Sequence, residues 1–193
     1  MIEPAPLSCS IADTEAMEDR EQIRYELWQG QPRAMTGGTP AHNLITLALR
    51  DVLRDQVKPC RVFTSDVAVR LGEADDADKA YPDLMVVCNP SMERVQRAPV
   101  LLAEVLSDSS VRRDRVDKMR GYTRLASCQV YLILHQTARH VEVYRRENAW
   151  RVEHYLDGVI ELASPAVRIP LNAVYAELGE LGLDLGEAPG DWL

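Results

Sequence analysis

Two acidic side chains lie in the most apolar segments of the chain. Asp83 is part of YPDLMVVC (81–88), and Glu104 is part of VLLAEVLS (100–107). Such runs are typical of central strands covered on both faces, where a carboxylate is costly unless it is paired, hydrogen-bonded or bound to a metal. Two carboxylates with no neighbouring Cys or His favour Mg²⁺ or Mn²⁺, which polarises a phosphoryl oxygen and activates water. In the structural alternative, Asp83 caps its strand and Glu104 faces a basic partner.

A basic segment follows the second of these runs. Residues 111–124 hold six basic side chains and two acidic ones, and a predicted helix begins close to the end of the Glu104 strand. Lys118 would therefore reach the carboxylates, where a cation orients the attacking water or stabilises the phosphate in the transition state. The three arginines near the helix start, Arg112, Arg113 and Arg115, are predicted to bind flanking phosphates. The alternatives are a solvated helix face and a simple pair of Lys118 with Asp114, four residues earlier.

The elements that position these residues are indicated by periodicity and turn signals. The sequence predicts an irregular arm over 1–20, a hairpin over 24–35, a helix that begins at Thr39 and Pro40, and a strand over 60–71. After an acidic loop (72–80) come the two apolar strands, which are separated by a loop, and the basic helix, which is capped by Ser109 or Ser110. Four strands follow over 128–134, 140–146, 150–156 and 158–164, the last three as an antiparallel meander, and then a short helix.

Composition and charge limit the classes of protein that remain. The chain has 193 residues and is 46% hydrophobic, which indicates one globular domain. The net charge of −8 argues against a nucleic-acid partner, but the acids concentrate at the two ends, 1–26 and 177–193, around a nearly neutral body. We divide the chain into an acidic arm (1–23), a main domain (24–178) and an acidic tail (179–193).

Cysteines and apolar runs indicate the compartment. The four cysteines are far apart in sequence and form no CxxC pair, so neither a zinc site nor a disulfide framework is expected. Cys88 and Cys128 are interpreted as small buried hydrophobic residues. No apolar run approaches the ~18 residues of a membrane span, and the acidic N-terminus is unlike a signal peptide, so we expect a cytoplasmic protein without a membrane partner.

The order of these segments resembles that of the PD-(D/E)xK nuclease superfamily and, more narrowly, the Uma-type family of bacterial restriction endonucleases. The matching segments cover about 25–177: YELWQG (25–30), His42, DVAVRL (66–71), PDLMVV (82–87), LLAEVLS (101–107), RRDRVDKMRGYTRLA (112–126), VYLIL (130–134) and VEVYR (141–145). The resemblance implies an α/β fold with a restriction-endonuclease-like core, in which helices flank a mixed central sheet and an antiparallel meander follows.

The resemblance also assigns roles to individual residues. Asp83 would be the metal-bridging aspartate, Glu104 the second acidic ligand and the backbone carbonyl of Val105 the third. The signature lysine should stand two residues after Glu104, but Leu106 occupies that position, which points to Lys118 on the following helix as its replacement.

Five other residues have side chains that could take part in such a site. Glu26 and His42 are possible accessory residues, with a surface carboxylate and a helix-start histidine as the alternatives. His135, His140 and His154 show no ligand spacing and are interpreted as surface or strand-end residues.

The expected function is Mg²⁺- or Mn²⁺-dependent endonucleolytic hydrolysis of DNA by a cytoplasmic homodimer, because two active sites suit the cutting of both strands. The absence of the strand lysine favours one alternative, a catalytically silent nuclease-derived module that binds nucleic acid or regulates. A third possibility is an adapter whose acidic ends bind a basic partner.

Overall fold

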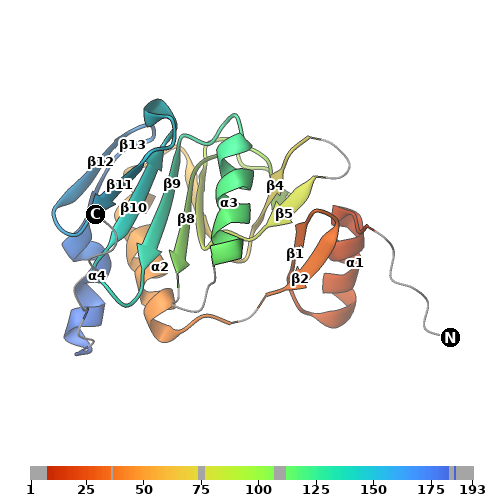
Figure 1. Cartoon of the computed structure of the whole chain (residues 1–193), viewed down its shortest axis with the longest axis horizontal. Coiled ribbons are helices and arrows are strands. Elements are labelled where there is room, and N and C mark those ends of the chain that lie inside the picture. The colour runs from red at the N-terminus through yellow and green to blue at the C-terminus, as the bar shows by residue number, and fades with distance from the viewer. Residues whose placement is uncertain (1–7, 36, 74–76, 107–111, 183–184, 186–193) are drawn as a thin grey trace.

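The computed structural model describes residues 8–35, 37–73, 77–106, 112–182 and 185, without the side chains of residues 112–115. The elements, drawn in Figure 1, are α1 (Ile11–Glu21), β1 (Tyr25–Trp28), β2 (Gln31–Ala34), α2 (Pro40–Arg54), β3 (Arg61–Thr64), β4 (Ala68–Leu71), β5 (Asp78–Ala80), β6 (Leu84–Val87), β7 (Val95–Gln96), β8 (Pro99–Leu106), α3 (Arg112–Arg124), β9 (Val130–His135), β10 (Val141–Arg145), the 3₁₀ turn η1 (Arg146–Asn148), β11 (Val152–Tyr155), β12 (Val159–Ala163), β13 (Ala166–Pro170) and α4 (Leu171–Glu180).

A six-stranded mixed sheet forms the centre of the molecule. Its order is β11-β10-β9-β8-β6-β3, with β8 and β9 parallel and the other pairs antiparallel. The two apolar runs become β6 and β8 at the middle of this sheet, where nearly every side chain is buried. The predicted α/β class with a mixed central sheet flanked by helices is confirmed.

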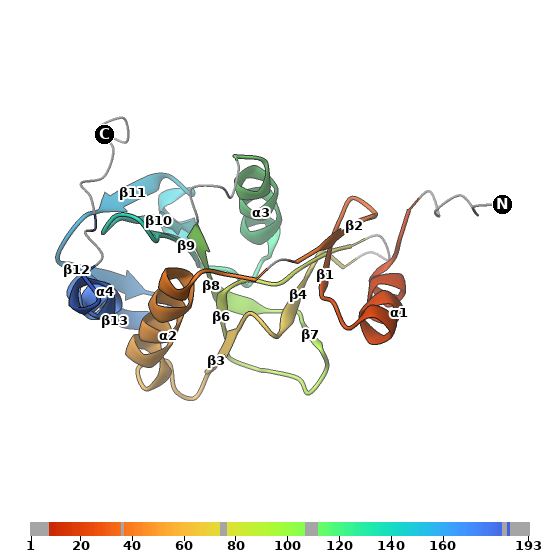
Figure 2. The same cartoon turned by 90° about the horizontal axis from the view of Figure 1, so that it is seen from below.

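Different layers cover the two faces of this sheet. Figure 2 shows α3 on one face, and α2, α4 and the β12–β13 hairpin on the other. Because side chains alternate along a strand, β8 contributes Leu101 and Ala103 to the core under α2 and α4, and Leu102 to the core under α3. The basic helix of the sequence analysis is α3, and it covers one face of the central sheet.

Helix α2 begins as the sequence predicts. The Thr39 hydroxyl accepts a hydrogen bond from the His42 N–H, and Pro40 occupies the first turn. Ile45, Leu49 and Leu53 recur every four residues and are fully buried. The helix ends at Arg54.

The N-terminal segment differs from the prediction. Residues 11–21 form α1, whereas an irregular arm was expected over 1–20. Ser10 and Asp13 form a reciprocal capping box, and Glu18 on the helix pairs with the fully buried Lys79 at 2.8 Å. Because α1 has only a weak apolar stripe, its stability depends on these tertiary contacts, which local periodicity does not show.

Three predictions about strands were also wrong. The segment 60–71 forms two strands, β3 in the large sheet and β4 in a second sheet of order β2-β1-β5-β4-β7. The loops over 72–80 and 89–99 contain β5 and β7. The third strand of the expected meander, β12, pairs with β13 and not with β11, because Ile160 and Leu162 are buried in the core under α2 and α4.

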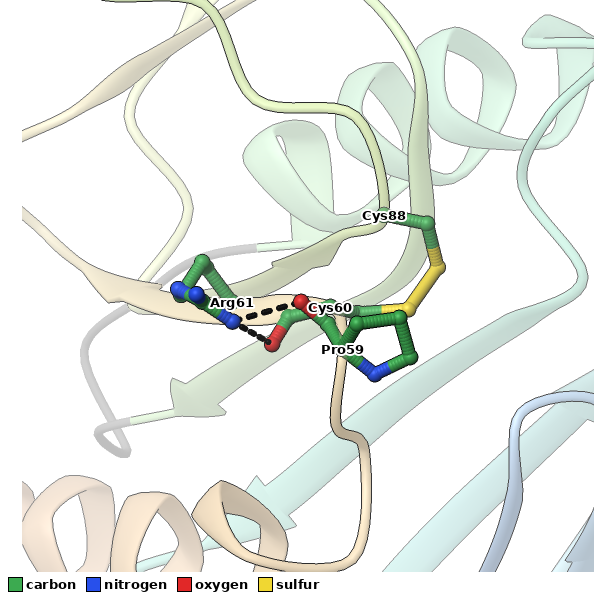
Figure 3. Close-up of a disulfide and its surroundings, with 4 residues drawn as sticks. All are labelled: Pro59, Cys60, Arg61 and Cys88. Carbon is green, nitrogen blue, oxygen red and sulfur yellow. Dashed lines mark hydrogen bonds between the residues drawn. A yellow bond between two sulfur atoms is a disulfide. The ribbon is translucent and has the colours of Figure 1, made fainter.

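Cys60 and Cys88 form a disulfide bond between neighbouring strands (Figure 3). The sequence analysis, which expected no disulfide framework and interpreted Cys88 as a small buried hydrophobic residue, was therefore wrong about this pair, whereas Cys128 is free and buried as predicted. Arg61 pairs with Val87 in the antiparallel β3–β6 register, which brings the two flanking cysteines opposite each other. This pairing follows from the strand register, which cysteine spacing alone does not give.

None of the helices in the described ranges has the length and apolar character needed to cross a membrane.

The buried ion pair of α1 gives a stability prediction. Lys79→Met should lower the free energy of unfolding by roughly 3 kcal/mol, because Glu18 would remain mostly buried without its cation. Urea denaturation measures this change. The matched control is Lys58→Met, which removes an exposed pair with Asp55 and should cost less than about 1 kcal/mol. Equal losses in the two variants would contradict a structural role for the buried pair.

Candidate active site

Asp83 and Glu104 are neighbours on one face of the central sheet. The β6–β8 register pairs Leu84 with Ala103, so the next pair towards the start of β6 is Asp83 with Glu104. Alternation places both side chains on the face that α3 covers. Asp83 is 9% exposed and Glu104 is 3% exposed. Two carboxylates are thus held side by side in an apolar sheet, where each needs compensating partners.

The Asp83 carboxylate is held as an anion. Its Oδ2 accepts a hydrogen bond from the Val105 N–H at 2.7 Å and lies 3.0 Å from His42 Nε2. Burial acts to raise the pKa of Asp83, but the hydrogen bonds and charges around it, above all those of His42, hold that pKa below its usual range. Within the described residues, Oδ1 accepts no hydrogen bond, so this oxygen is available to a cation.

The Glu104 carboxylate is shared between two donors from α3. Lys118 Nζ lies 2.9 Å from Oε2, and the Tyr122 hydroxyl donates to Oε1 at 2.6 Å. Burial raises the pKa of Glu104, and the negative charges of Asp83 and Glu26 act in the same direction, against the ammonium of Lys118. Burial acts to lower the pKa of Lys118, but the surrounding carboxylates outweigh it and keep the pKa above its ordinary value.

Glu26 reaches the site from the second sheet. Its Oε1 lies 3.5 Å from Lys118 Nζ and accepts a hydrogen bond from the Tyr81 N–H, and its Oε2 accepts one from Trp28 Nε1. The side chain is 13% exposed, so the structure does not place Glu26 as a surface carboxylate. Three carboxylates therefore surround one lysine.

Close packing of α3 against the strands brings Lys118 and Tyr122 to the Glu104 carboxylate. A Cβ at Gly121 would lie 2.8 Å from Leu71 Cδ1 and 3.3 Å from the Trp28 ring, so the absence of a side chain lets the helix approach β4 and β1. Lys118 and Tyr122 are four residues apart and share one helix face. The sequence analysis missed Tyr122, although this spacing was a signal for it.

An open pocket of about 700 Å³ connects these groups to solvent. Its lining includes the five predicted residues Glu26, His42, Asp83, Glu104 and Lys118, together with Val105, Leu106 and several residues that the sequence analysis did not select, among them Arg24, Arg33 and Gln136. Arg24 directly precedes β1 and Arg33 lies on β2, and both bring positive charge to a pocket that three carboxylates also line. Their approach depends on how the hairpin docks, for which the sequence carries no direct signal.

The structure does not test the other predicted roles. The side chains of Arg112, Arg113 and Arg115 lie outside the described part of the chain, as do Ser109 and Ser110. Leu106 lines the pocket two residues after Glu104, while Lys118 approaches the same carboxylate from α3. The metal-binding role of the Val105 carbonyl stays a prediction.

The donor set fits a hard divalent cation. Asp83, Glu104 and Glu26 supply oxygen donors, and Lys118 is the cation shared by two of them. Excess negative charge around oxygen ligands suits Mg²⁺ or Mn²⁺ and disfavours ions that prefer sulfur or nitrogen.

Comparison with known proteins identifies the family. The model of the Uma2 family, described as "Putative restriction endonuclease", matches residues 11–172. This chain belongs to the Uma2 family. The match begins at the start of α1, so it includes the helix that the sequence analysis did not predict.

Individual proteins are also similar to this chain. Two uncharacterized proteins of Synechocystis sp. are among them. The protein slr1290 is 26% identical over 83% of this chain and 88% of its own length. The protein sll1609 is 29% identical over 67% of this chain and 76% of its own length. A crystal structure from Anabaena variabilis, described as a "putative nuclease belonging to DUF820", superposes with a TM-score of 0.67 at 18% identity, covering 81% of this chain and 92% of that one. The latter likeness shows a shared fold.

The hydroxyl of Tyr122 gives a second stability prediction. Tyr122→Phe should lower the free energy of unfolding by about 1–3 kcal/mol, because the buried Glu104 carboxylate would lose a hydrogen bond that water cannot replace. Tyr25→Phe is the matched control, since the Tyr25 hydroxyl bonds Glu21 at the surface. Thermal and urea unfolding of both variants test the difference, and an unchanged Tyr122→Phe protein would contradict the prediction.

Proposed function

We propose that this Uma2 protein is a Mg²⁺-dependent endonuclease that hydrolyses phosphodiester bonds in DNA. The observation that carries the proposal is the pairing of Asp83 with Glu104 at an open pocket, with Lys118 directed at the same point. Membership of a family described as restriction endonucleases supports the reaction class.

Each residue has a role in this proposal. Asp83 and Glu104, with the Val105 carbonyl, would hold the ion, which when bound polarises a phosphoryl oxygen and activates water. Lys118 stabilises the negative charge that develops on the phosphate in the transition state, and Glu26 and Glu104 hold its ammonium in place. His42 orients the Asp83 carboxylate through Oδ2 and leaves Oδ1 for the ion.

The rim of the pocket supports a polyanionic substrate. Arg24 and Arg33 line it on the hairpin side, and their side chains are 47% and 38% exposed. Guanidinium groups at this position suit the phosphates that flank the scissile bond, with Arg112, Arg113 and Arg115 as further contacts. On a chain of net charge −8, binding should be modest and sensitive to salt.

One observation favours a second function. Leu106 occupies the position of the signature lysine and lines the pocket. A catalytically silent module that binds nucleic acid would keep the fold and the rim arginines and would need no lysine at this point. The two functions differ in turnover and not in binding, so an activity measurement separates them.

The catalytic prediction concerns plasmid nicking in Mg²⁺ or Mn²⁺. The wild-type protein should nick supercoiled DNA, Asp83→Asn should abolish nicking, and Lys118→Met should slow it by about a hundredfold or more. Asp51→Asn, at an exposed position on α2, is the matched control and should match the wild type. Circular dichroism and thermal unfolding establish that each variant is folded.

Two results would contradict the proposed endonuclease activity. Nicking that persists in Asp83→Asn would come from another source, and binding of DNA without nicking by the wild type would support the silent module. Lys118→Arg adds a further test, because it retains the positive charge and should recover part of the rate lost in Lys118→Met.

The rim prediction concerns the salt dependence of DNA binding. In an Asp83→Asn background, Arg24→Gln should weaken duplex binding and reduce the slope of log K against log salt by about 1, because one phosphate contact is lost. Fluorescence anisotropy between 50 and 200 mM salt, the range over which phosphate contacts respond strongly, measures the slope. Arg54→Gln, on the outer part of α2, should leave it unchanged.

The proposed assembly is a homodimer, which would present two active sites to the two strands of a duplex. Light scattering that gives the mass of a single chain at working concentration would contradict it.

A further inference from the structure

A second group of ligand-type side chains lies on the sheet beyond the pocket. His135 at the end of β9, His140 in the following turn and Glu142 on β10 each offer one donor atom, and these atoms all lie within 4.8 Å of one another. His135 ends β9 and His140 directly precedes β10, as the strand-end interpretation predicted, but the sequence analysis missed that their ligand-type atoms lie close together. Leu134 pairs with Val141, so His135 and His140 face each other across the β9–β10 turn.

Direct contacts hold the members of this group close together. His135 Nε2 lies 2.9 Å from Glu142 Oε1, and the rings of His135 and His140 stack with centroids 4.4 Å apart. His140 is 1% exposed, and the Glu142 side chain is 1% exposed. Two imidazoles and a carboxylate are thus held together on two neighbouring strands and the turn that joins them.

Outer partners orient two of the three donors. His140 Nε2 lies 2.9 Å from Nδ1 of His154 on β11, and the Tyr144 hydroxyl donates to Glu142 Oε2 at 2.6 Å. Hydrogen bonds of this kind fix the tautomer of a ligating histidine and the direction of a ligating carboxylate. The donor atoms to an ion would be the other ring nitrogen of His140 and Oε1 of Glu142, with the ion displacing the present contact of Oε1 with His135.

The chemistry of this set differs from that of the pocket. Two histidines with one glutamate are a known donor set for Zn²⁺ with one position left open, whereas the pocket offers mainly carboxylate oxygens. The two groups are also separate in the sheet. Glu104 pairs with Ile133 on β9, and Ile133 pairs with Glu142 on β10, so the apolar strand β9 lies between them.

We propose that His135, His140 and Glu142 bind one transition-metal dication of the zinc class, separately from the cation site at Asp83 and Glu104. Donors in a tetrahedral zinc site are about 3.4 Å apart at ordinary bond lengths, so the ion replaces the 2.9 Å His135–Glu142 hydrogen bond after a small outward rotation of the side chains. The His135 side chain is 17% exposed and gives the ion its path from solvent.

The bound ion clamps the turn between β9 and β10. Gln136 follows His135 directly, lines the catalytic pocket and pairs with the Thr39 hydroxyl that caps α2. The metal therefore stabilises the turn that carries one wall of the pocket. This inference does not depend on the proposed nuclease activity, because it concerns other ligands and another class of ion.

Cobalt binding tests the proposal directly. Full-length protein without a histidine tag, carrying Asp83→Asn and Glu104→Gln to disable the oxygen site, is treated with a chelator, dialysed and titrated with Co²⁺. We expect one ion per chain, with the visible absorption of low-coordinate cobalt, its displacement by Zn²⁺, and a rise in the thermal unfolding midpoint with either ion. The same titration of the wild-type chain should add a second, weaker event from the oxygen site.

Ligand variants identify the site. His135→Gln and Glu142→Gln, each in the same background, should weaken Co²⁺ binding by about tenfold or more, since even outer partners of metal ligands are worth that much. His42→Gln is the matched control, because it removes a histidine from the pocket and should leave the absorption unchanged. His135→Gln is the least disruptive ligand variant because His135 is the most exposed of the three, and its circular dichroism establishes folding.

Two outcomes would overturn the proposal. If Co²⁺ and Zn²⁺ produce neither absorption nor a shift of the unfolding midpoint at millimolar concentration, the group is a hydrogen-bonded network without a metal. If binding is retained in His135→Gln and in Glu142→Gln, the ion is held elsewhere. Either result leaves the nuclease proposal untouched, since plasmid nicking is measured independently.

Discussion

The burial of three carboxylates around one ammonium is the constraint on which the rest of this structure depends. Glu26 comes from the second sheet, Asp83 and Glu104 from the central sheet, and Lys118 from α3. Because a buried charge without partners is costly, these elements are fixed relative to one another by the same electrostatic requirement. Helix α1 is tied into this arrangement, since the Tyr81 hydroxyl bonds Glu18 of α1 while the Tyr81 N–H bonds Glu26.

The position of Lys118 shows how a site can keep its geometry when its sequence pattern changes. The expected strand position holds Leu106, yet an ammonium lies 2.9 Å from Glu104 because α3 packs closely over the sheet at Gly121. A helix that returns over its own preceding strand brings residues more than ten positions later in the chain to the same place. A positive charge at Glu104 can therefore come from a neighbouring helix as well as from the strand itself.

Local signals predicted the parts of the fold that local chemistry determines. The Thr39 cap, the β1–β2 hairpin and the two apolar strands follow from short patterns, and Asp83 and Glu104 were conspicuous because acids are rare in such strands. The parts that were missed depend on register between distant segments. The Cys60–Cys88 bond and the burial of Glu18 against Lys79 both require knowledge of which distant segments are neighbours.

The assembly of the pocket from two sheets has a consequence for folding. Glu26 and Lys118 are separated by nearly half of the chain, and β8 and β9 form a parallel pair that needs the intervening α3 as its crossover. Contacts of such long range close late, because the entropy of the loop between them must be lost before the contact is gained. A partly folded chain thus exposes separated acids and a solvated lysine, which come together only in the complete native topology.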